Sequence, residues 1–206
     1  QNLDPKQMEE FSRQLFGADS TKAMNAKLIV AGLLMGVKGD KAFMTSEAAG
    51  EYIQSKFDSL QEVRQAEARA EQERYKKENE DYMAQLAENP ELQVLDSTIY
   101  YQIITEGNGA VPTETSRVKV KYEGRLIDGT VFDSTNEDDQ PRSFQANQVI
   151  DGWTTALTHM PVGSKWKVYI PWEKGYGQYG NGSSIKPYST LVFTIELIEI
   201  ESGEED

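Results

Sequence analysis

Aromatic side chains gather in one stretch of this sequence that offers few groups for covalent catalysis. The 206-residue chain contains one histidine and no cysteine, which leaves little for nucleophilic attack or for binding a metal ion. Aromatic and aliphatic side chains around one buried carboxylate, Asp133, predict an apolar pocket. Such a pocket suits a reaction that breaks no covalent bond, and it needs no cofactor. The rings concerned belong to Tyr122, Phe132, Trp153, Tyr176 and Phe193.

The elements that must position these rings have the periodicity of β-strands. From Gln93 onward, apolar residues recur at every second position, and turn signals rich in Gly, Asn, Asp and Pro separate the apolar segments. A short helix is expected at residues 151–157, before Pro161. We therefore predict an α+β domain in which an antiparallel sheet wraps around one short helix. The expected strands include residues 101–103, 117–122, 165–170 and 191–197.

The first half of the chain is helical in its periodicity. Its longest expected helix starts at the cap Thr45-Ser46-Glu47 and meets no breaker before Pro90. That helix would have roughly 40 residues and a length of about 60 Å. Two shorter helices are expected before it. The sequence thus predicts an all-α dimerisation region at residues 1–44, a long connecting helix at 45–89 and a sheet domain at 90–206.

Two segments of the helical half have opposite needs for burial. The segment from Leu28 to Met35 is apolar on nearly all sides and requires more cover than its neighbours offer. A second copy of the chain is the simplest cover, so we expect a homodimer through the N-terminal helices. The alternative is that this segment packs on its own C-terminal domain. Residues 61–81, by contrast, are nearly all charged or small, and we expect them to stand in solvent.

The charge of the chain excludes several classes of partner. A formal net charge of −13 argues against binding to nucleic acid or to anionic lipid. No apolar run approaches the ~20 residues that span a bilayer. Membrane contact is therefore expected only through a lipid anchor upstream of Gln1. Because the sequence begins with Gln1 and not with methionine, we expect its N-terminus to have been trimmed, and any signal peptide or lipid-bearing cysteine upstream would then lie outside this sequence.

Three segments of the sheet half resemble the FKBP-type peptidyl-prolyl cis-trans isomerase domain. They read YEGRLIDGTVFDST at 122–135, QVIDGWTTAL at 148–157 and PYSTLVF at 187–193. The helical half is similar in layout to the dimerising region of the macrophage infectivity potentiator (Mip) and FkpA group. The resemblance implies an enzyme that rotates X-Pro bonds in unfolded or proline-containing polypeptides. It also implies chaperone activity of a V-shaped homodimer, in the periplasm or at the outer-membrane surface of a Gram-negative bacterium.

Carried over onto these motifs, the resemblance implies a site for a proline ring. Trp153 would form the floor, Asp133 would stand at one side, and Tyr176 would offer its hydroxyl at the rim. The backbone N–H of Ile150 would donate to a bound carbonyl, and Ile185 would close over the site. Trp153 has a plainer alternative reading as a core aromatic, and so does Phe193. The walls would be Tyr122, Phe132, Val149, Ile150 and Phe193.

The sequence departs from the family pattern at two positions near the expected site. Arg142 stands where many relatives have an aromatic wall residue, and we expect it to contact substrate. Asp138 stands where an arginine often pairs with the pocket aspartate, and two acids cannot form that ion pair. Both departures bear on substrate preference and on the binding of macrolide inhibitors, the other ligands that the resemblance implies. They motivate one alternative, a module that binds proline-containing partners or unfolded chains with little turnover. A dimeric spacer is a separate alternative.

Overall fold

The computed structural model describes residues 46–135 and 140–201. The two short helices expected near the N-terminus, the apolar segment 28–35 and Asp138 lie outside the described residues. The chain divides into two compact units, one ending at Gln65 and the other beginning at Ala66. The second unit contains the sheet domain and holds every residue of the expected site.

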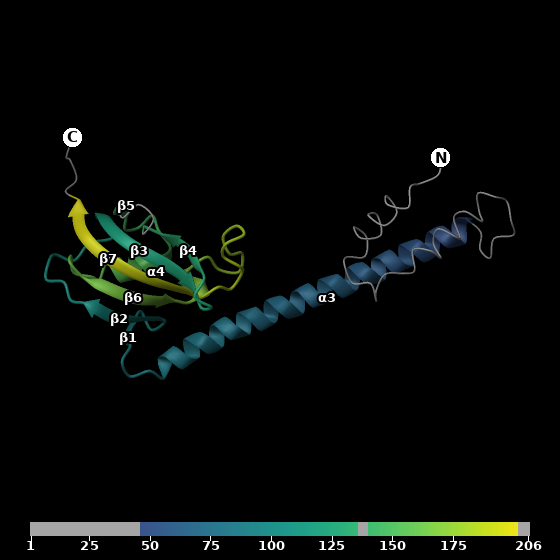
Figure 1. Ribbon diagram of the computed structural model, residues 1–206, viewed down its shortest axis with the longest axis horizontal. Helices are drawn as coiled ribbons and strands as arrows, with labels where there is room; N and C mark the ends of the chain where they lie inside the picture. Colours follow the sequence, from purple (N-terminus) through teal and green to yellow (C-terminus); the bar gives the residue numbers. More distant parts are fainter. Residues whose placement is uncertain (1–45, 136–139, 202–206) are drawn as a thin grey trace. The chain divides into compact units, whose positions relative to one another are not determined.

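The long helix predicted from the sequence is present as α3, which runs from Ser46 to Ala87 over 42 residues (Figure 1). It begins within the predicted cap. It ends just before Asn89, the residue preceding Pro90, where a proline ring disfavours helical backbone in the residue before it. The side chains of residues 61–74 are exposed, as their composition predicts.

The expectation that the whole charged segment stands in solvent is wrong for its last turns. Tyr75 and Lys76 are half-buried, and Asn79 is fully buried. The reason is a specific hydrogen bond, since the Asn79 side chain accepts the backbone N–H of Thr190 at 2.7 Å. The periodicity of apolar residues does not predict such a contact, because the contact stabilises the fold by pairing a buried backbone N–H and not by burying apolar surface.

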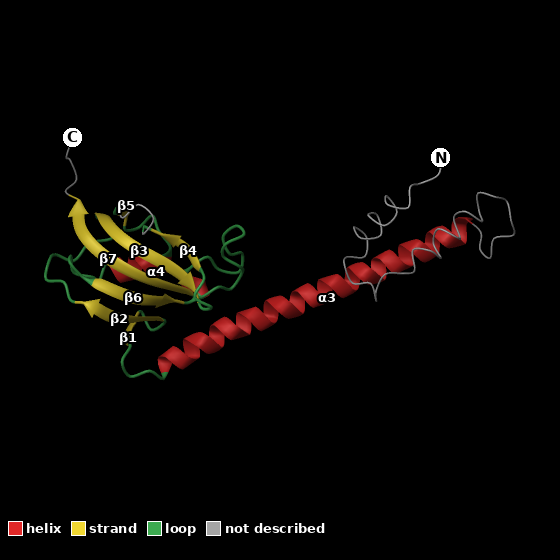
Figure 2. Ribbon diagram, in the orientation of Figure 1, coloured by secondary structure: helices red, strands yellow, loops and turns green. Residues whose placement is uncertain are grey.

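Within the described residues, seven antiparallel strands form one sheet in the order β1-β2-β6-β7-β3-β4, with β5 paired to β3 (Figure 2). The predicted strands are all found, three of them longer than expected. The three further strands, β1, β4 and β5, are short. Their bounds are β1 Gln93–Leu95, β2 Ile99–Thr105, β3 Arg117–Leu126, β4 Val131–Ser134, β5 Arg142–Gln145, β6 Lys165–Ile170 and β7 Leu191–Glu201.

The sheet wraps around α4, which spans Asp151–Leu157 as predicted (Figure 2). A short 3-10 helix, η1, follows β6 at Trp172–Lys174. Alternate residues of β3 face the core, and four apolar side chains of β7 lie on the same buried face. The fold is therefore the predicted α+β sheet domain preceded by a long helix. The core-facing residues of these two strands are Val118, Val120, Tyr122, Gly124, Leu126, Leu191, Phe193, Ile195 and Leu197.

Candidate active site

The register of the sheet brings three parts of the expected site to one level. Gly124 of β3 pairs with Phe193 of β7 on one side and with Asp133 of β4 on the other. A Cβ atom at Gly124 would lie 2.6–2.7 Å from ring atoms of Phe132 and Phe193, closer than carbon atoms pack. The missing side chain at Gly124 therefore lets these two rings meet edge to face, 5.5 Å apart.

Trp153 lies at the centre of a group of rings that stand nearly perpendicular to it. Its ring centroid is 5.0 Å from that of Tyr122, 5.6 Å from that of Phe144 and 5.2 Å from that of Phe193, with interplanar angles of 77–86°. The first turn of α4 carries Trp153, so the helix sets the depth of the indole. Rings at right angles to a central indole make a floor with walls.

These rings line a cavity of about 400 Å³, which is large enough for a small apolar group and part of the chain on either side of it. Ile150 lines it as well, at the N-cap of α4. Among the described residues the Ile150 N–H has no intramolecular hydrogen-bond acceptor, which leaves it available to a bound carbonyl. The predicted residues that line the cavity together are Tyr122, Phe132, Asp133, Val149, Ile150, Trp153, Tyr176 and Phe193.

Two predicted residues lie elsewhere, and two unpredicted residues line the cavity. Ile185 is buried at 3% exposure in the main core and does not line the cavity. Arg142 also lies outside the lining. Phe144, and not Arg142, supplies a wall of the cavity from β5. Side chains two positions apart on a strand lie on the same face, so Phe144 shares the face of Arg142. That spacing was the available signal for Phe144, and the available signal for Gln148 was its place at the start of the motif QVIDGWTTAL.

Arg142 contacts two residues of the site, Tyr122 and Asp133. Its Nη1 donates to the Tyr122 hydroxyl at 3.0 Å and lies 3.3 Å from a carboxylate oxygen of Asp133, while Tyr122 donates to Asp133 at 2.6 Å. Asp133 thus has an arginine partner, supplied from β5. The expectation of a buried carboxylate is wrong, because the Asp133 side chain is 48% exposed. Exposure spares it the desolvation cost of a buried charge.

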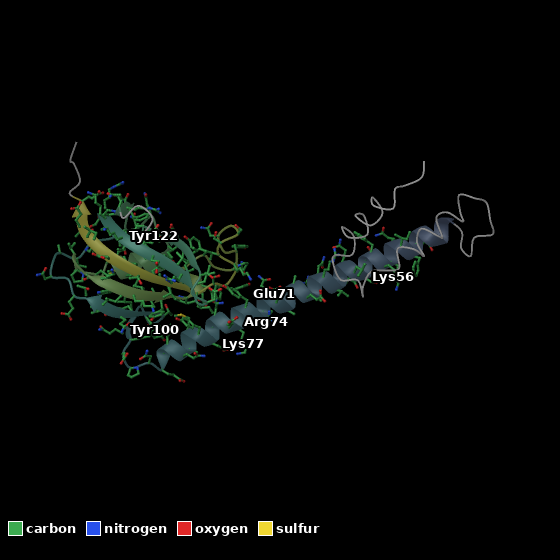
Figure 3. All side chains as sticks on the ribbon, in the orientation of Figure 1. Lys56, Glu71, Arg74, Lys77, Tyr100 and Tyr122 are labelled. Carbon is green, nitrogen blue, oxygen red and sulfur yellow. The ribbon has the colours of Figure 1, made fainter. Side chains whose placement is uncertain are left out.

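Burial is the main cause that raises the pKa of Tyr122 to about 12, and the hydrogen bond to Asp133 and the charge of that carboxylate raise it further. The nearby charge of Arg142 acts in the opposite direction and lowers this pKa. Tyr122 lies on β3 within the sheet domain (Figure 3). At neutral pH the hydroxyl therefore keeps its proton and serves as a fixed donor to Asp133. A phenol held in this state orients its neighbours and does not transfer protons.

The cavity offers apolar ring surface and a backbone N–H donor, which suit the binding and orientation of a ligand. Within residues 46–135 and 140–201, no group of three or more His, Asp and Glu side chains could hold a metal ion. In the same part of the chain, no helix is both long enough and apolar enough to cross a bilayer. An apolar cavity walled by crossed rings, in a sheet wrapped around one short helix, is the arrangement expected of the FKBP-like isomerase domain that the sequence motifs resemble.

Comparison with known proteins gives the family. Residues 109–198 match the FKBP-type peptidyl-prolyl cis-trans isomerase family, and residues 7–103 match the domain amino terminal to FKBP-type peptidyl-prolyl isomerase. The chain belongs to the FKBP-type peptidyl-prolyl cis-trans isomerase family. The family and the class of enzyme predicted from the sequence are thereby confirmed.

Individual relatives cover different shares of the chain. The outer membrane protein MIP of Legionella longbeachae is 37% identical over 180 residues, which cover 87% of this chain and 77% of that protein. The FKBP-type 22 kDa peptidyl-prolyl cis-trans isomerase of Escherichia coli is 50% identical over 119 residues, 58% of each chain. The crystal structure of FkpA from Escherichia coli matches with a TM-score of 0.71 at 26% identity, covering 95% of this chain and 90% of that one.

Proposed function

We propose that this chain holds the proline ring of an X-Pro peptide over Trp153 while the preceding carbonyl rotates. The observation that carries the proposal is the cavity of about 400 Å³ with crossed aromatic rings as its floor and walls. A pyrrolidine ring is compact and apolar, so it buries its surface there without leaving a polar group unpaired. The substrates are unfolded or proline-containing polypeptides.

The rate enhancement follows from the electronic structure of the amide. Rotation has a barrier of ~18–20 kcal/mol because the C–N bond has partial double-bond character. In the half-rotated state this resonance is lost, and the carbonyl is less polar than in either planar isomer. An apolar, water-poor cavity therefore stabilises the half-rotated amide relative to both planar forms.

Polar groups at the edge of the cavity assign the remaining roles. The free N–H of Ile150 and the hydroxyl of Tyr176 donate to carbonyl groups of the bound chain and hold it while the X-Pro bond turns. Asp133 and Arg142 fix the Tyr122 ring from outside through their hydrogen bonds to its hydroxyl. None of these roles requires a proton to be transferred.

Turnover of a proline tetrapeptide tests the proposal. Trp153 and Trp166 are both buried at 4% exposure, but only Trp153 lines the cavity, and Trp166 stacks on Tyr101 instead. We expect Trp153→Leu to lower kcat/KM at least about tenfold, and Trp166→Leu to lower stability without a comparable loss of turnover. Cis-to-trans rates with the wild-type protein equal to those in buffer would refute the proposal.

We also propose that the chain works as a V-shaped homodimer joined through its N-terminal helices. In its support, apolar side chains recur along the first part of α3: Tyr52, Ile53 and Phe57 are 41–54% exposed. Sedimentation equilibrium should give twice the mass of the chain. Charged substitutions at Ile53 and Phe57 should shift the protein to monomer, and a monomeric wild-type protein at all concentrations would contradict the dimer.

Two isomerase domains in one dimer would also bind unfolded chains, so we propose chaperone activity outside the cytoplasm, in the periplasm or at the outer-membrane surface. Similarity to a protein named as an outer membrane protein supports this location. The full chain should slow the aggregation of a denatured client, and Trp153→Leu should retain part of that effect. Client aggregation unaffected by the wild-type protein would remove the chaperone from the proposal.

A further inference from the structure

The last turns of α3 contact the loop that carries one wall of the cavity. We name residues 175–190 the site loop; it includes Tyr176, which lines the cavity, and it leads into β7 with Phe193. We infer that Tyr75 and Asn79 of α3 are positioning residues for the isomerase site, because they hold the site loop from the side of the helix. This inference rests on the proposed isomerase function of the same cavity.

Asn79 is the centre of the contact and is fully buried, with 0% of its surface exposed. Its Oδ1 accepts the backbone N–H of Thr190 at 2.7 Å, and its Nδ2 donates to the carbonyl of Tyr75 at 2.9 Å. Thr190 is equally buried, and its hydroxyl reaches the backbone carbonyl of Asn79 at 3.4 Å. Both ends of the Asn79 amide are used, so its orientation is fixed.

Tyr75 adds a second attachment one turn earlier on the helix. Its hydroxyl lies 3.0 Å from the Ser189 hydroxyl, and Ser189 in turn donates to the carbonyl of Lys186 at 2.8 Å. Because the single hydroxyl hydrogen of Ser189 is directed at Lys186, Tyr75 is the donor between the two hydroxyls. The ammonium of Lys186 lies 5.3 Å from the centre of the Tyr75 ring and closes the contact.

The site loop transmits this attachment to the cavity wall. Tyr188 has a backbone φ of +63°, which is unusual for a bulky residue, and its N–H donates to the carbonyl of Gly177 at 3.0 Å. Gly177 directly follows Tyr176. The Tyr188 ring stands at 82° to that of Trp172, and the Lys76 ammonium lies within 6 Å of both ring centres. Such a backbone conformation persists only where its surroundings determine it, and α3 supplies part of them.

Asn79→Ala is the main test. Alanine has a higher helix propensity than asparagine, so the change leaves α3 intact. The buried backbone N–H of Thr190, however, loses its hydrogen-bond acceptor. We expect kcat/KM for a proline tetrapeptide to fall about three- to tenfold. The amide of Tyr188 and the amide of Gly180, which donates to the Tyr176 carbonyl at 3.2 Å, should exchange hydrogen faster. The matched control is Lys77→Ala: Lys77 is 73% exposed on the same helix (Figure 3) and pairs with Asp81, so both readouts should stay at wild-type values.

A milder pair of variants keeps the test decisive if Asn79→Ala does not fold. Tyr75→Phe retains the ring and Ser189→Ala retains the backbone, so each removes one hydroxyl of the contact. We expect a lower kcat/KM in each. Ser189→Ala removes the bond to Tyr75 and also the bond to the Lys186 carbonyl, so the double variant should have the same kcat/KM as Ser189→Ala alone.

Two outcomes overturn the inference. One is a lower melting temperature with wild-type kcat/KM and wild-type exchange in the folded protein, because the contact would then be structural only. The other is wild-type behaviour of Tyr75→Phe and Asn79→Ala in every readout. Should the wild-type protein show no turnover, the proposed function fails, and amide exchange in the site loop still decides whether α3 holds it.

Discussion

Replacing Gly152 by alanine tests how closely α4 must lie on the sheet to keep Trp153 as the cavity floor. Gly152 directly precedes Trp153 and faces Ile170, which is fully buried on β6. An added Cβ would lie 2.8 Å from Cδ1 and 2.9 Å from Cγ1 of Ile170, and closer still to its Cγ2. Carbon atoms pack at about 3.5–4.0 Å and the Cγ2 contact is the shortest, so the helix or the strand must move by more than about 1 Å.

The free-energy change is the difference of two effects. Overpacking costs about 1–3 kcal/mol, and Ile170 belongs in the upper part of that range because Cγ2 of a β-branched side chain moves only through a stiff χ1. Alanine gains up to about 1 kcal/mol over glycine in a helix. We therefore expect Gly152→Ala to destabilise the protein by about 1–2 kcal/mol. A shift of about 1 Å at Trp153 would also lower kcat/KM, by up to about 100-fold.

A second background supplies the control. Ile170→Ala removes all three carbon atoms that the new Cβ would meet, so Gly152→Ala should there stabilise the protein by up to about 1 kcal/mol. The expected coupling between the two sites is then about 2–3 kcal/mol. Urea unfolding followed by tryptophan fluorescence measures it, since Trp153, Trp166 and Trp172 all lie in the second unit. Equal effects of Gly152→Ala in both backgrounds would refute the reasoning.

Two further predictions concern the Tyr122–Asp133–Arg142 contact. Arg142→Met should change the unfolding free energy by less than about 1 kcal/mol, because both partners of the ion pair are nearly half exposed. The same change should lower kcat/KM about two- to tenfold. A large loss of stability without loss of turnover would contradict this prediction. The folded protein raises the pKa of Tyr122 to about 12, above its value of about 10 in the unfolded chain. The protonated Tyr122 hydroxyl therefore stabilises the fold fully below about pH 10, and this stabilisation is lost as pH rises toward about 12. The difference in unfolding free energy between wild type and Tyr122→Phe should therefore stay constant from about pH 6 to pH 9 and shrink above pH 10, and a change within the lower range would disprove the assignment.

The sequence by itself determined the longer local elements and most of the cavity rings, with Phe144 the exception. The four longer strands of the sheet and the short helix at Asp151–Leu157 were predictable because alternation and turn residues act over a few neighbouring positions. The start of α3 near Ser46 and its end before Pro90 were predictable for the same reason. The family resemblance of the motif at 148–157 then implied Trp153 as the cavity floor, and α4 carries Trp153 into the cavity lining.

Only the tertiary structure decided contacts between residues far apart in the chain. Arg142 reaches Tyr122 and Asp133 across the β3–β5 pairing, and no local pattern encodes that approach. The burial of Asn79 depends on a backbone donor 111 positions away at Thr190, so its polar neighbourhood in the sequence pointed to solvent. Periodicity reports which face of an element is apolar, whereas hydrogen bonds between distant elements depend on where the whole chain places their donors and acceptors.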